Sequence, residues 1–276
     1  MTGAEALRAA IPRLTEAGVP DAPRDARLLL SHAAGIAPER LTLHLADPLS
    51  DADLAAFEVA IRRRVAREPV SHITGQRLFW GRRFHVTPDT LDPRPETETL
   101  VAAALSEPFD RVLDLGTGTG CILLSCLADR PGATGMGTDI HPATLAVAER
   151  NARDLGLADR AMFRLSDWFA AVPGVFDLIL SNPPYIAEDE MLALAPELDH
   201  EPRRALTPGG DGLSAYRAIA RGLRASLAPG GRVMVEIGPT QASAVMALFA
   251  AAGLTDCRVL HDLDGRDRVV SARAPG

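Results

Sequence analysis

Residues 112–120 read Val-Leu-Asp-Leu-Gly-Thr-Gly-Thr-Gly, and an apolar stretch follows at 121–128. This order predicts a buried strand, a tight turn and a helix. Glycine lets the backbone approach a ligand closely, and open α/β sheets bind ligands at the carboxyl ends of their strands. We therefore expect a ligand at Gly116–Gly120, although a glycine turn without a ligand has the same pattern.

Short apolar runs alternate with helical stretches around this turn. The runs predict strands at 111–115, 135–140, 161–165, 178–181, 232–237, 257–261 and 268–272. The helical stretches are 97–105, 120–128, 142–155, 213–227 and 240–252. Such alternation predicts an α/β fold with a mostly parallel sheet covered on both faces. Only a short turn joins the last two strands, so we expect the last strand to be antiparallel.

The first part of the chain lacks this alternation. Apolar residues recur there at helical spacing, with Asp25, Ser50 and Asp53 as candidate helix starts. Aromatic residues around Gly81 then indicate a hairpin. We expect a small helical domain at 1–75, a hairpin linker at 76–95 and an α/β domain at 96–276.

The amino-acid composition excludes several classes of function. All 29 basic residues among the 276 are Arg, which excludes lysine chemistry, and the net charge of −7 disfavours binding through nucleic-acid phosphates. Three cysteines form no disulfide framework, and no metal site is expected. The sequence shows no signal peptide and no transmembrane segment, so we expect a cytoplasmic protein.

Asp139 narrows the identity of the ligand. It ends the next predicted strand, 23 residues after Gly116, where a carboxylate can accept hydrogen bonds from ribose hydroxyls. The dinucleotide pattern G-x-G-x-x-G needs glycine at position 121, which is Cys121. Asp114 would repel a diphosphate but suits a cationic or zwitterionic ligand. The pattern resembles class I S-adenosylmethionine methyltransferases more closely than NAD enzymes.

Asn182-Pro183-Pro184-Tyr185 follows the strand at 178–181, so it lies at the same edge of the sheet. The Asn182 side-chain oxygen and the Pro183 carbonyl can accept hydrogen bonds from an NH₂ group and direct its lone pair at a methyl group. Pro184 stiffens the loop, and Tyr185 can stack on a planar group. This motif predicts a planar nitrogen as acceptor, in DNA, RNA or protein. Asn-Pro-Pro is also an ordinary turn sequence.

Other stretches of the sequence are similar to one family, the HemK/PrmC methyltransferases, which act on the glutamine of the Gly-Gly-Gln motif in class-1 peptide chain release factors. The matching stretches are 69–75, 79–84, Pro-Arg-Pro-Glu-Thr-Glu at 93–98, the glycine loop, 166–168, 181–186, 209–213 and 236–238. The resemblance implies a Rossmann-like, seven-stranded catalytic domain and transfer of a methyl group to the glutamine N5.

The resemblance also implies roles for single residues. S-adenosylmethionine, which leaves as S-adenosylhomocysteine, would be bound by Gly116, Thr117, Gly118, Thr119, Gly120, Asp139, Trp168 and Asn182. Asn182–Tyr185 would bind the glutamine and form the catalytic loop, and the helical domain would help to dock the release factor. Asp92 departs from the aliphatic residue expected before Pro-Arg-Pro. The roles of Arg94, Glu96 and Glu98 stay open.

Two alternative functions remain possible, and the basic segment at 62–94 has two possible interpretations. The first is an adenine N6 or other nucleic-acid amino-group methyltransferase, and the second is a module that binds S-adenosylmethionine without catalysis. We expect a monomer that forms no stable complex with nucleic acid and does not associate with membranes.

Residues 62–94 carry 8 Arg and 3 acidic residues, a net charge of +5. We favour a solvated helix face for the run Arg62–Arg64, with release-factor docking as the alternative.

Overall fold

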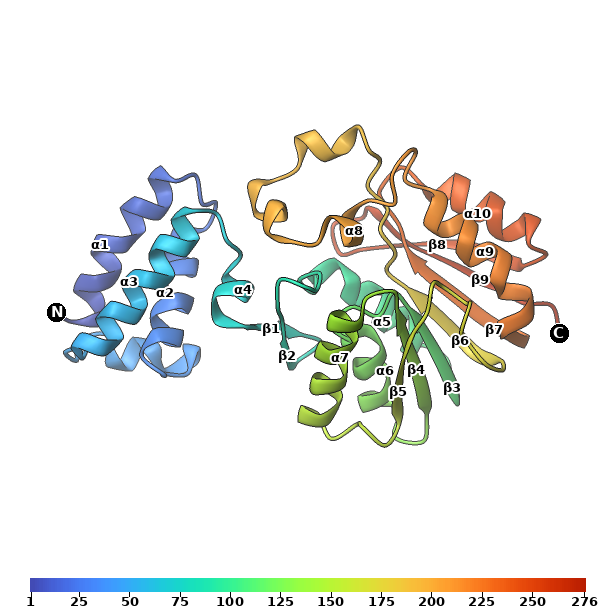
Figure 1. Cartoon of the computed structure of the whole chain (residues 1–276), viewed down its shortest axis with the longest axis horizontal. Helices are drawn as coiled ribbons and strands as arrows, with labels where there is room; N and C mark the ends of the chain where they lie inside the picture. The colour runs from blue at the N-terminus through green and yellow to red at the C-terminus, as the bar shows by residue number, and fades with distance from the viewer. The chain divides into compact units, whose positions relative to one another are not determined.

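The computed structural model describes residues 1–276, and the chain forms two compact units. Unit 1 comprises Met1–Gln76 together with Ala195–His200. Unit 2 comprises Arg77–Leu194 and Glu201–Gly276 (Figure 1). The chain therefore passes between the units three times, which nothing in the sequence pattern indicated.

Unit 1 is helical and has its own apolar core. Its elements are α1 (Gly3–Glu16), α2 (Ala22–Ala33), η1 (Pro38–His44), α3 (Asp51–Val65), α4 (Val70–Thr74) and η4 (Pro196–His200). Side chains cap three of the helices: Thr2 before α1, Asp21 before α2 and Ser50 before α3. The prediction of Asp25 as a helix start was wrong, because Asp21 accepts the first-turn N–H instead.

The segment 195–200 is bound to unit 1 by charge. Arg64 Nη2 donates to Glu197 Oε1 at 3.0 Å, and Arg67 binds both oxygens of the same carboxylate. Arg64 also donates to Asp25 Oδ2 at 2.8 Å and is only 5% exposed. Arg63 Nε donates to Glu68 Oε2 at 2.7 Å.

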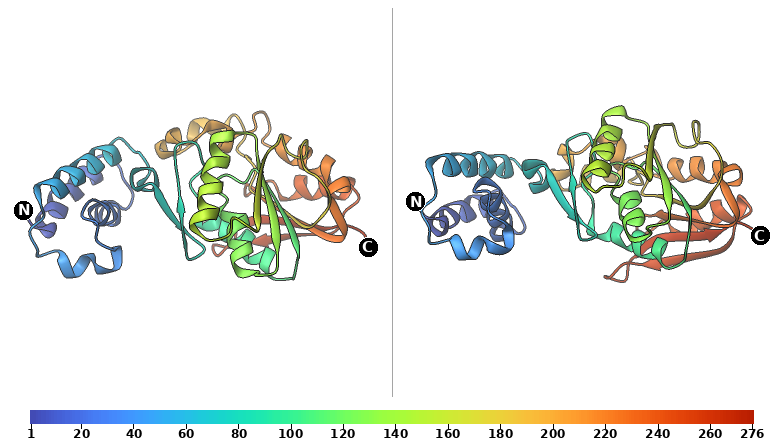
Figure 2. Two further views of the ribbon diagram at one scale, coloured as in Figure 1. Left: turned by 60° about the horizontal axis from the view of Figure 1, so that its bottom comes forward. Right: turned by 90° about the horizontal axis from the view of Figure 1, so that it is seen from below.

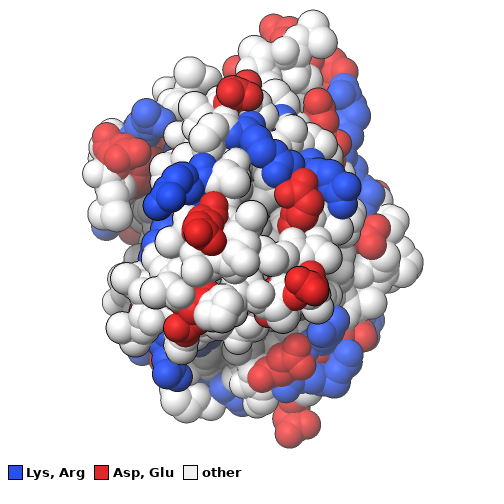
Figure 3. All heavy atoms as spheres, turned by 90° about the vertical axis from the view of Figure 1, so that its left-hand side faces the viewer, with Lys and Arg blue, Asp and Glu red and all other residues white.

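The run Arg62–Arg64 is therefore a solvated face only in part: Arg62 is exposed, whereas Arg64 is buried. Two of its three guanidinium groups are held in ion pairs inside unit 1. The surface view shows Arg and acidic side chains interspersed, with no large area of a single sign on the face it presents (Figure 3). Charge steering of a partner by Arg63 and Arg64 is not supported.

The hairpin of β1 (Gln76–Phe79) and β2 (Arg82–His85) turns at Trp80 and Gly81, which both have positive φ. Phe79 and Phe84 meet edge to face at a centroid distance of 6.1 Å. Both rings are buried in the core of unit 2. The Trp80 N–H donates to Glu98 Oε1 at 2.7 Å, so Glu98 has a structural role in holding the hairpin.

Unit 2 contains the predicted seven-stranded sheet, in the order β5-β4-β3-β6-β7-β9-β8. The strands are β3 (Arg111–Leu115), β4 (Thr134–Asp139), β5 (Ala161–Leu165), β6 (Phe176–Ser181), β7 (Leu227–Glu236), β8 (Thr255–His261) and β9 (Asp267–Arg273). The first five of this order are parallel, and β9 is antiparallel to both of its neighbours. The predicted fold class is confirmed.

Helices cover both faces of this sheet (Figure 2). On one side lie α5 (Glu98–Leu105), α6 (Cys121–Asp129) and α7 (Pro142–Asp154); on the other lie α9 (Ser214–Ser226) and α10 (Ala242–Ala251). Val112 belongs to the first core and Leu113 to the second, as the alternation of side chains along a strand requires. No helix is long and apolar enough to cross a membrane.

The chain order of the strands reverses next to β3. Its neighbours are β4, which follows it directly, and β6, which comes later in the chain. Connections leave such a point in opposite directions and open a crevice at the carboxyl ends of the strands. Between β6 and α9 the chain forms η3 (Glu190–Ala193), η4 and α8 (Arg203–Leu206), which we did not predict.

Candidate active site

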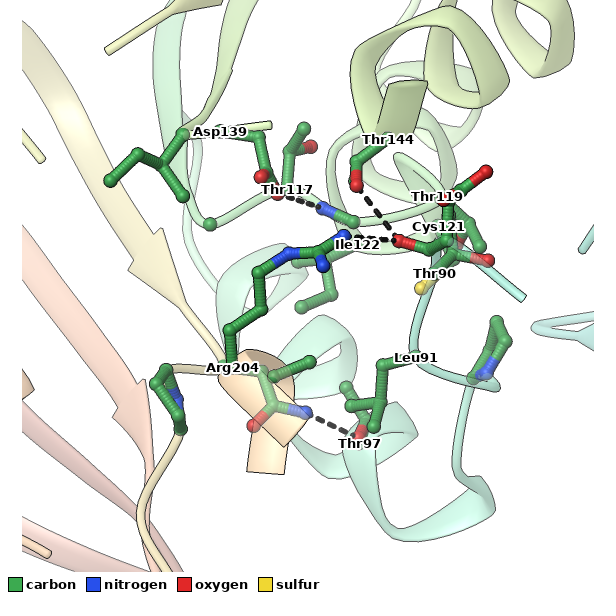
Figure 4. A pocket seen from close by; sticks show the side chains of 18 of the residues that line it. Thr90, Leu91, Thr97, Thr117, Thr119, Cys121, Ile122, Asp139, Thr144 and Arg204 are labelled. Carbon is green, nitrogen blue, oxygen red and sulfur yellow. Dashed lines mark hydrogen bonds between the residues drawn. The ribbon is translucent and has the colours of Figure 1, made fainter. Parts of the chain in front are cut away.

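A cavity of about 190 Å³ lies at the carboxyl edge of the sheet in unit 2 (Figure 4). It is lined by residues from 89–97, 116–122, 139–144, 166–168, 182–184 and 204–205. These include eight of the residues predicted for the site: Gly116, Thr117, Gly118, Thr119, Asp139, Trp168, Asn182 and Pro184. Gly120, Pro183 and Tyr185 do not line it.

The glycine loop leaves room where a side chain would otherwise stand. Gly116 and Gly118 have φ values of +68° and +57°, and a Cβ atom at either position would meet nothing within 4 Å. A hydrogen bond joins the loop to β4, since the Thr117 N–H donates to the Thr138 carbonyl at 2.8 Å. Gly120 precedes α6 and faces Leu124 rather than the cavity. The loop therefore presents backbone to any ligand in the cavity.

Asp114 supports this loop from beneath. Its side chain is fully buried, and Oδ2 accepts a hydrogen bond from the Thr117 hydroxyl at 2.7 Å. Burial raises the pKa of Asp114 to about 7. Because Asp114 does not line the cavity, its expected contact with a cationic ligand is replaced by a role in shaping the loop.

Asp139 lies at the end of β4 with its carboxylate at the cavity wall. Oδ2 accepts from the Gly118 N–H at 3.2 Å, and Oδ1 accepts from the His141 N–H at 3.0 Å. Burial raises its pKa, and these two backbone donors oppose that shift. Each oxygen retains acceptor capacity, so the carboxylate can receive two hydroxyl groups from one ligand.

Trp168 also lines the cavity, in an unusual backbone conformation. Its φ of +47° is rare for a bulky residue. The Ser166 hydroxyl donates to the Trp168 carbonyl at 2.8 Å and accepts from the Ala171 N–H at 3.0 Å, which holds the turn. This turn brings an aromatic residue to the cavity that Asp139 also lines.

The loop after β6 brings Asn182 and Pro184 to the cavity. Ser181 anchors its start by donating to the Leu115 carbonyl at 2.7 Å, which joins β6 to β3. The Asn182 side chain donates through Nδ2 to the Thr97 hydroxyl at 3.2 Å (Figure 4). With Nδ2 engaged in this way, Oδ1 is the end of the amide available to accept a hydrogen bond in the cavity.

Tyr185 lies behind the loop and packs against the α9–α10 core. Burial raises the pKa of its hydroxyl to about 12, so it is neutral and cannot serve as a base. Its carbonyl accepts from Gln241 Nε2 at 2.8 Å, and a Cβ atom on Gly212 would clash with that carbonyl. These contacts fix the end of the loop. Stacking of Tyr185 on a substrate remains a prediction.

Two sequence families match the chain. The PrmC N-terminal domain matches residues 5–75, and the methyltransferase small domain matches residues 90–217. The chain is 65% identical to the release factor glutamine methyltransferase of Cereibacter sphaeroides, over 100% of this chain and 99% of that protein. The chain belongs to the release factor glutamine methyltransferase family. The member from Rhodospirillum rubrum is 49% identical, over 95% of this chain and 82% of its own length.

Solved methyltransferase structures share the fold of unit 2 at low sequence identity. A methyltransferase from Pyrococcus furiosus aligns with a TM-score of 0.54 at 14% identity, over 70% of this chain and 89% of its own. The 16S rRNA N2 G1207 methyltransferase of T. thermophilus, solved with AdoMet and guanosine, aligns with a TM-score of 0.53 at 20% identity. That match covers 72% of this chain and 49% of the other. Both establish the methyltransferase fold.

Sequence reasoning missed Arg204 in the site of this family member. Its side chain extends from α8 into the cavity, and Nη2 donates to the Asp89 carbonyl at 3.2 Å (Figure 4). Its positive charge opposes the burial that raises the pKa of Asp139. Arg204 lies in a segment without a regular hydrophobic pattern, among many other arginines, so no sequence signal distinguished it.

Asp92, the departure from the family pattern, does not line the cavity. It is 3% exposed and lies 3.4 Å from Arg77 Nη1 and 3.7 Å from Arg94 Nη1. Its N–H donates to Glu201 Oε2, and Glu201 also pairs with Arg94. Asp92 therefore belongs to a buried ion cluster that holds Arg94 at the cavity wall.

Proposed function

We propose that this chain transfers a methyl group from S-adenosylmethionine to the side-chain amide nitrogen (N5) of the glutamine in the Gly-Gly-Gln motif of class-1 peptide chain release factors. The observation that carries the proposal is that the cradle at Gly116–Thr119 and the Asn182 amide line the same cavity. One wall is shaped to receive a ligand against bare backbone, and the other offers a hydrogen-bond acceptor. Family membership favours glutamine as the acceptor.

The cradle suits S-adenosylmethionine. Gly116 and Gly118 leave space against the backbone for its methionine part, and the Asp139 carboxylate would accept hydrogen bonds from both ribose hydroxyls. Trp168 would lie beside the adenine. When bound, S-adenosylmethionine supplies a methyl group on a positively charged sulfur.

Asn182 and Pro183 would hold the acceptor. Asn182 Oδ1 and the Pro183 carbonyl would each accept one hydrogen from the glutamine NH₂ group, which favours a pyramidal nitrogen with its lone pair directed at the methyl group. The nitrogen would then form a bond to the methyl carbon as the carbon–sulfur bond breaks, which would leave a neutral thioether. The methylated nitrogen is acidic, so its extra proton leaves to water without a dedicated base. The remaining rate enhancement would come from positioning, with the acceptor nitrogen roughly 3–3.5 Å from the methyl carbon.

Incubation with methyl-tritiated S-adenosylmethionine tests this function against both rivals. We expect label in purified release factor, none in DNA or RNA offered in parallel, and none in a release factor whose motif glutamine is changed to alanine. Label in nucleic acid alone would support the amino-group methyltransferase of nucleic acid instead. Tight cofactor binding without label in any acceptor would support the non-catalytic module.

A further inference from the structure

Three side chains from distant parts of unit 2 form a buried line that ends at the cavity. Asn182 follows β6, Thr97 ends the 3₁₀ turn η2 (Pro95–Thr97), and Glu236 ends β7. Asn182 Nδ2 donates to Thr97 Oγ1 at 3.2 Å. The Thr97 hydroxyl lies near enough to the Glu236 carboxyl to favour its charged form and lower its pKa. Thr97 is 2% exposed and Glu236 is 1% exposed.

Glu236 is poorly compensated for a buried acid. Its Oε2 has no hydrogen-bond partner, and the nearest ion-pair contact joins Oε1 to Arg268 Nη1 at 4.0 Å. A buried carboxyl with so little support costs stability, so packing alone gives no reason for an acid at this position. Its contact with Thr97 is the feature that connects it to the cavity.

The hydrogen-bonding capacities of these groups determine a direction along the line. An ionised carboxylate only accepts, whereas a hydroxyl has one proton to donate and lone pairs to accept. With Glu236 ionised, the Thr97 proton is directed at Glu236, so Thr97 can only accept from Asn182. The Asn182 amide must then present its NH₂ group to Thr97 and its oxygen to the cavity.

We propose that Thr97 and Glu236 are positioning residues that fix the orientation of the Asn182 amide, so that its oxygen rather than its nitrogen faces the acceptor NH₂ group. This rests on the proposed function. The two ends of an amide have nearly the same shape, so packing does not distinguish them. A flipped Asn182 would present NH₂ to NH₂, and neither could accept from the other.

The same arrangement makes the orientation depend on pH. Burial raises the pKa of Glu236 to about 7. Arg268 and Arg94 lower this pKa, Glu96 raises it, and the hydroxyls of Tyr185 and Tyr216 also face this region. Protonated Glu236 can donate to Thr97, which frees the Thr97 proton to point at Asn182 and favours the flipped amide. We expect kcat to fall as the pH drops through about 7.

Three variants test the line, with S-adenosylmethionine affinity measured by calorimetry and kcat and KM measured on release factor. In Thr97→Val the anchor is lost, and we expect kcat to fall roughly 10- to 100-fold with cofactor affinity unchanged. Thr97→Ser keeps the hydroxyl and should restore kcat. In Glu236→Gln the direction is no longer enforced, so kcat should fall and its decline at low pH should disappear.

Matched controls are available in unit 2 on exposed positions outside the site. Thr134→Val at the start of β4 and Glu149→Gln on α7 should keep the wild-type kcat. Asp114 also has a pKa of about 7, so the pH dependence of kcat is measured for Asp114→Asn as well. Both tryptophans, Trp80 and Trp168, lie in unit 2, so their fluorescence shows whether each variant is folded.

The outcomes separate the inference from the function. Wild-type turnover in Thr97→Val, or Thr97→Ser as slow as Thr97→Val, would overturn the positioning role. A decline at low pH that persists in Glu236→Gln and vanishes in Asp114→Asn would overturn the role of Glu236. If the wild-type enzyme methylates no glutamine, the proposed function fails first. If Thr97→Val does not fold, the kcat of Thr97→Ser and the pH dependence of kcat in Glu236→Gln still test the positioning role.

Discussion

The Gly118 N–H donates to Asp139 Oδ2 at 3.2 Å, which joins the loop after β3 to the end of β4. Gly118 has the positive φ that lets its N–H face the carboxylate, and the His141 N–H holds the other oxygen at 3.0 Å. The Asp139 carboxylate is therefore oriented before any ligand arrives. A pre-oriented acceptor loses little conformational entropy on binding, which favours affinity for the cofactor.

Asp139→Asn should weaken S-adenosylmethionine binding by roughly 10- to 100-fold, since hydrogen bonds to a charged group contribute about 1.5–3 kcal/mol. Burial raises the pKa of Asp139, so wild-type affinity should also fall as the pH drops through that pKa, while the variant shows no such dependence on this group. Calorimetric titration measures both effects. Asp154→Asn, on the exposed end of α7, is the control. Equal affinity of the Asp139 variant and the wild type would exclude the ribose contact.

Gly118→Ala should abolish cofactor binding while leaving unit 2 folded. The new Cβ meets no protein atom within 4 Å, so it projects into open space at the cradle. The positive φ adds a backbone cost of about 1 kcal/mol. Gly265→Ala, in the turn between β8 and β9, has the same kind of φ and open surroundings away from the cavity. The account predicts equal losses of stability and a loss of binding in Gly118→Ala alone, measured by urea titration and calorimetry.

Asp114→Asn should change how stability depends on pH. The pKa of Asp114 is raised from 3.8 to about 7, so between these values the folded protein keeps a proton that the unfolded chain releases. The wild-type free energy of unfolding therefore falls as the pH rises through this window. Asparagine has no such loss and retains an oxygen for Thr117. At pH 8 it should be more stable than the wild type by on the order of 2–4 kcal/mol, with the advantage gone below pH 4.

Tryptophan fluorescence in urea reports this difference for unit 2, which contains both tryptophans. Asp110→Asn, at an exposed carboxyl before β3, is the matched control and should follow the wild type at every pH. A gain for Asp114→Asn that is the same at pH 4 and pH 8 would show that titration of Asp114 is not the cause.

Arg64→Met should destabilise unit 1 strongly. It leaves the partly buried Asp25 carboxylate without its charged partner, which costs up to about 3–5 kcal/mol, while Glu197 keeps its pairing with Arg67. Unit 1 has no Trp or Tyr, so hydrogen exchange of the α2 and α3 amides is the suitable measurement. Arg62→Met, on an exposed neighbour, should leave protection unchanged. Equal protection in both variants would mean that Glu197 does not hold the segment 195–200 through Arg64.

The seven strands were predictable because buried parallel strands are short apolar runs bounded by turns. Val112 and Leu113 show why this works, since both faces of β3 are covered and both residues must be apolar. The segment between β6 and α9 was not predictable. The 3₁₀ turns there depend on long-range contacts such as Glu197–Arg64, which joins positions 133 apart in sequence.

The residues of the site also fall into a group that was predictable from the sequence and a group that was not. The residues at Gly116–Thr119, Asp139 and Asn182 stand in local motifs at strand ends, so the sequence predicted their common edge of the sheet. Arg204 reaches the site through tertiary contacts alone. Thr97 and Glu236 stand in stretches that resemble the family, at 93–98 and 236–238, but nothing in their local sequence places them beside Asn182. Asp114 shows the converse, a motif residue whose side chain points beneath the loop.

Mass spectrometry of the Gly-Gly-Gln peptide from release factor incubated with S-adenosylmethionine and either the wild-type chain or Asn182→Ala tests the central claim most directly. The account predicts a gain of about 14 Da, one CH₂, on the motif glutamine with the wild type. With Asn182→Ala the rate of that gain should be at least about 100-fold lower while cofactor affinity is retained. An unmodified glutamine with the wild type, or an undiminished rate with Asn182→Ala, would contradict the account.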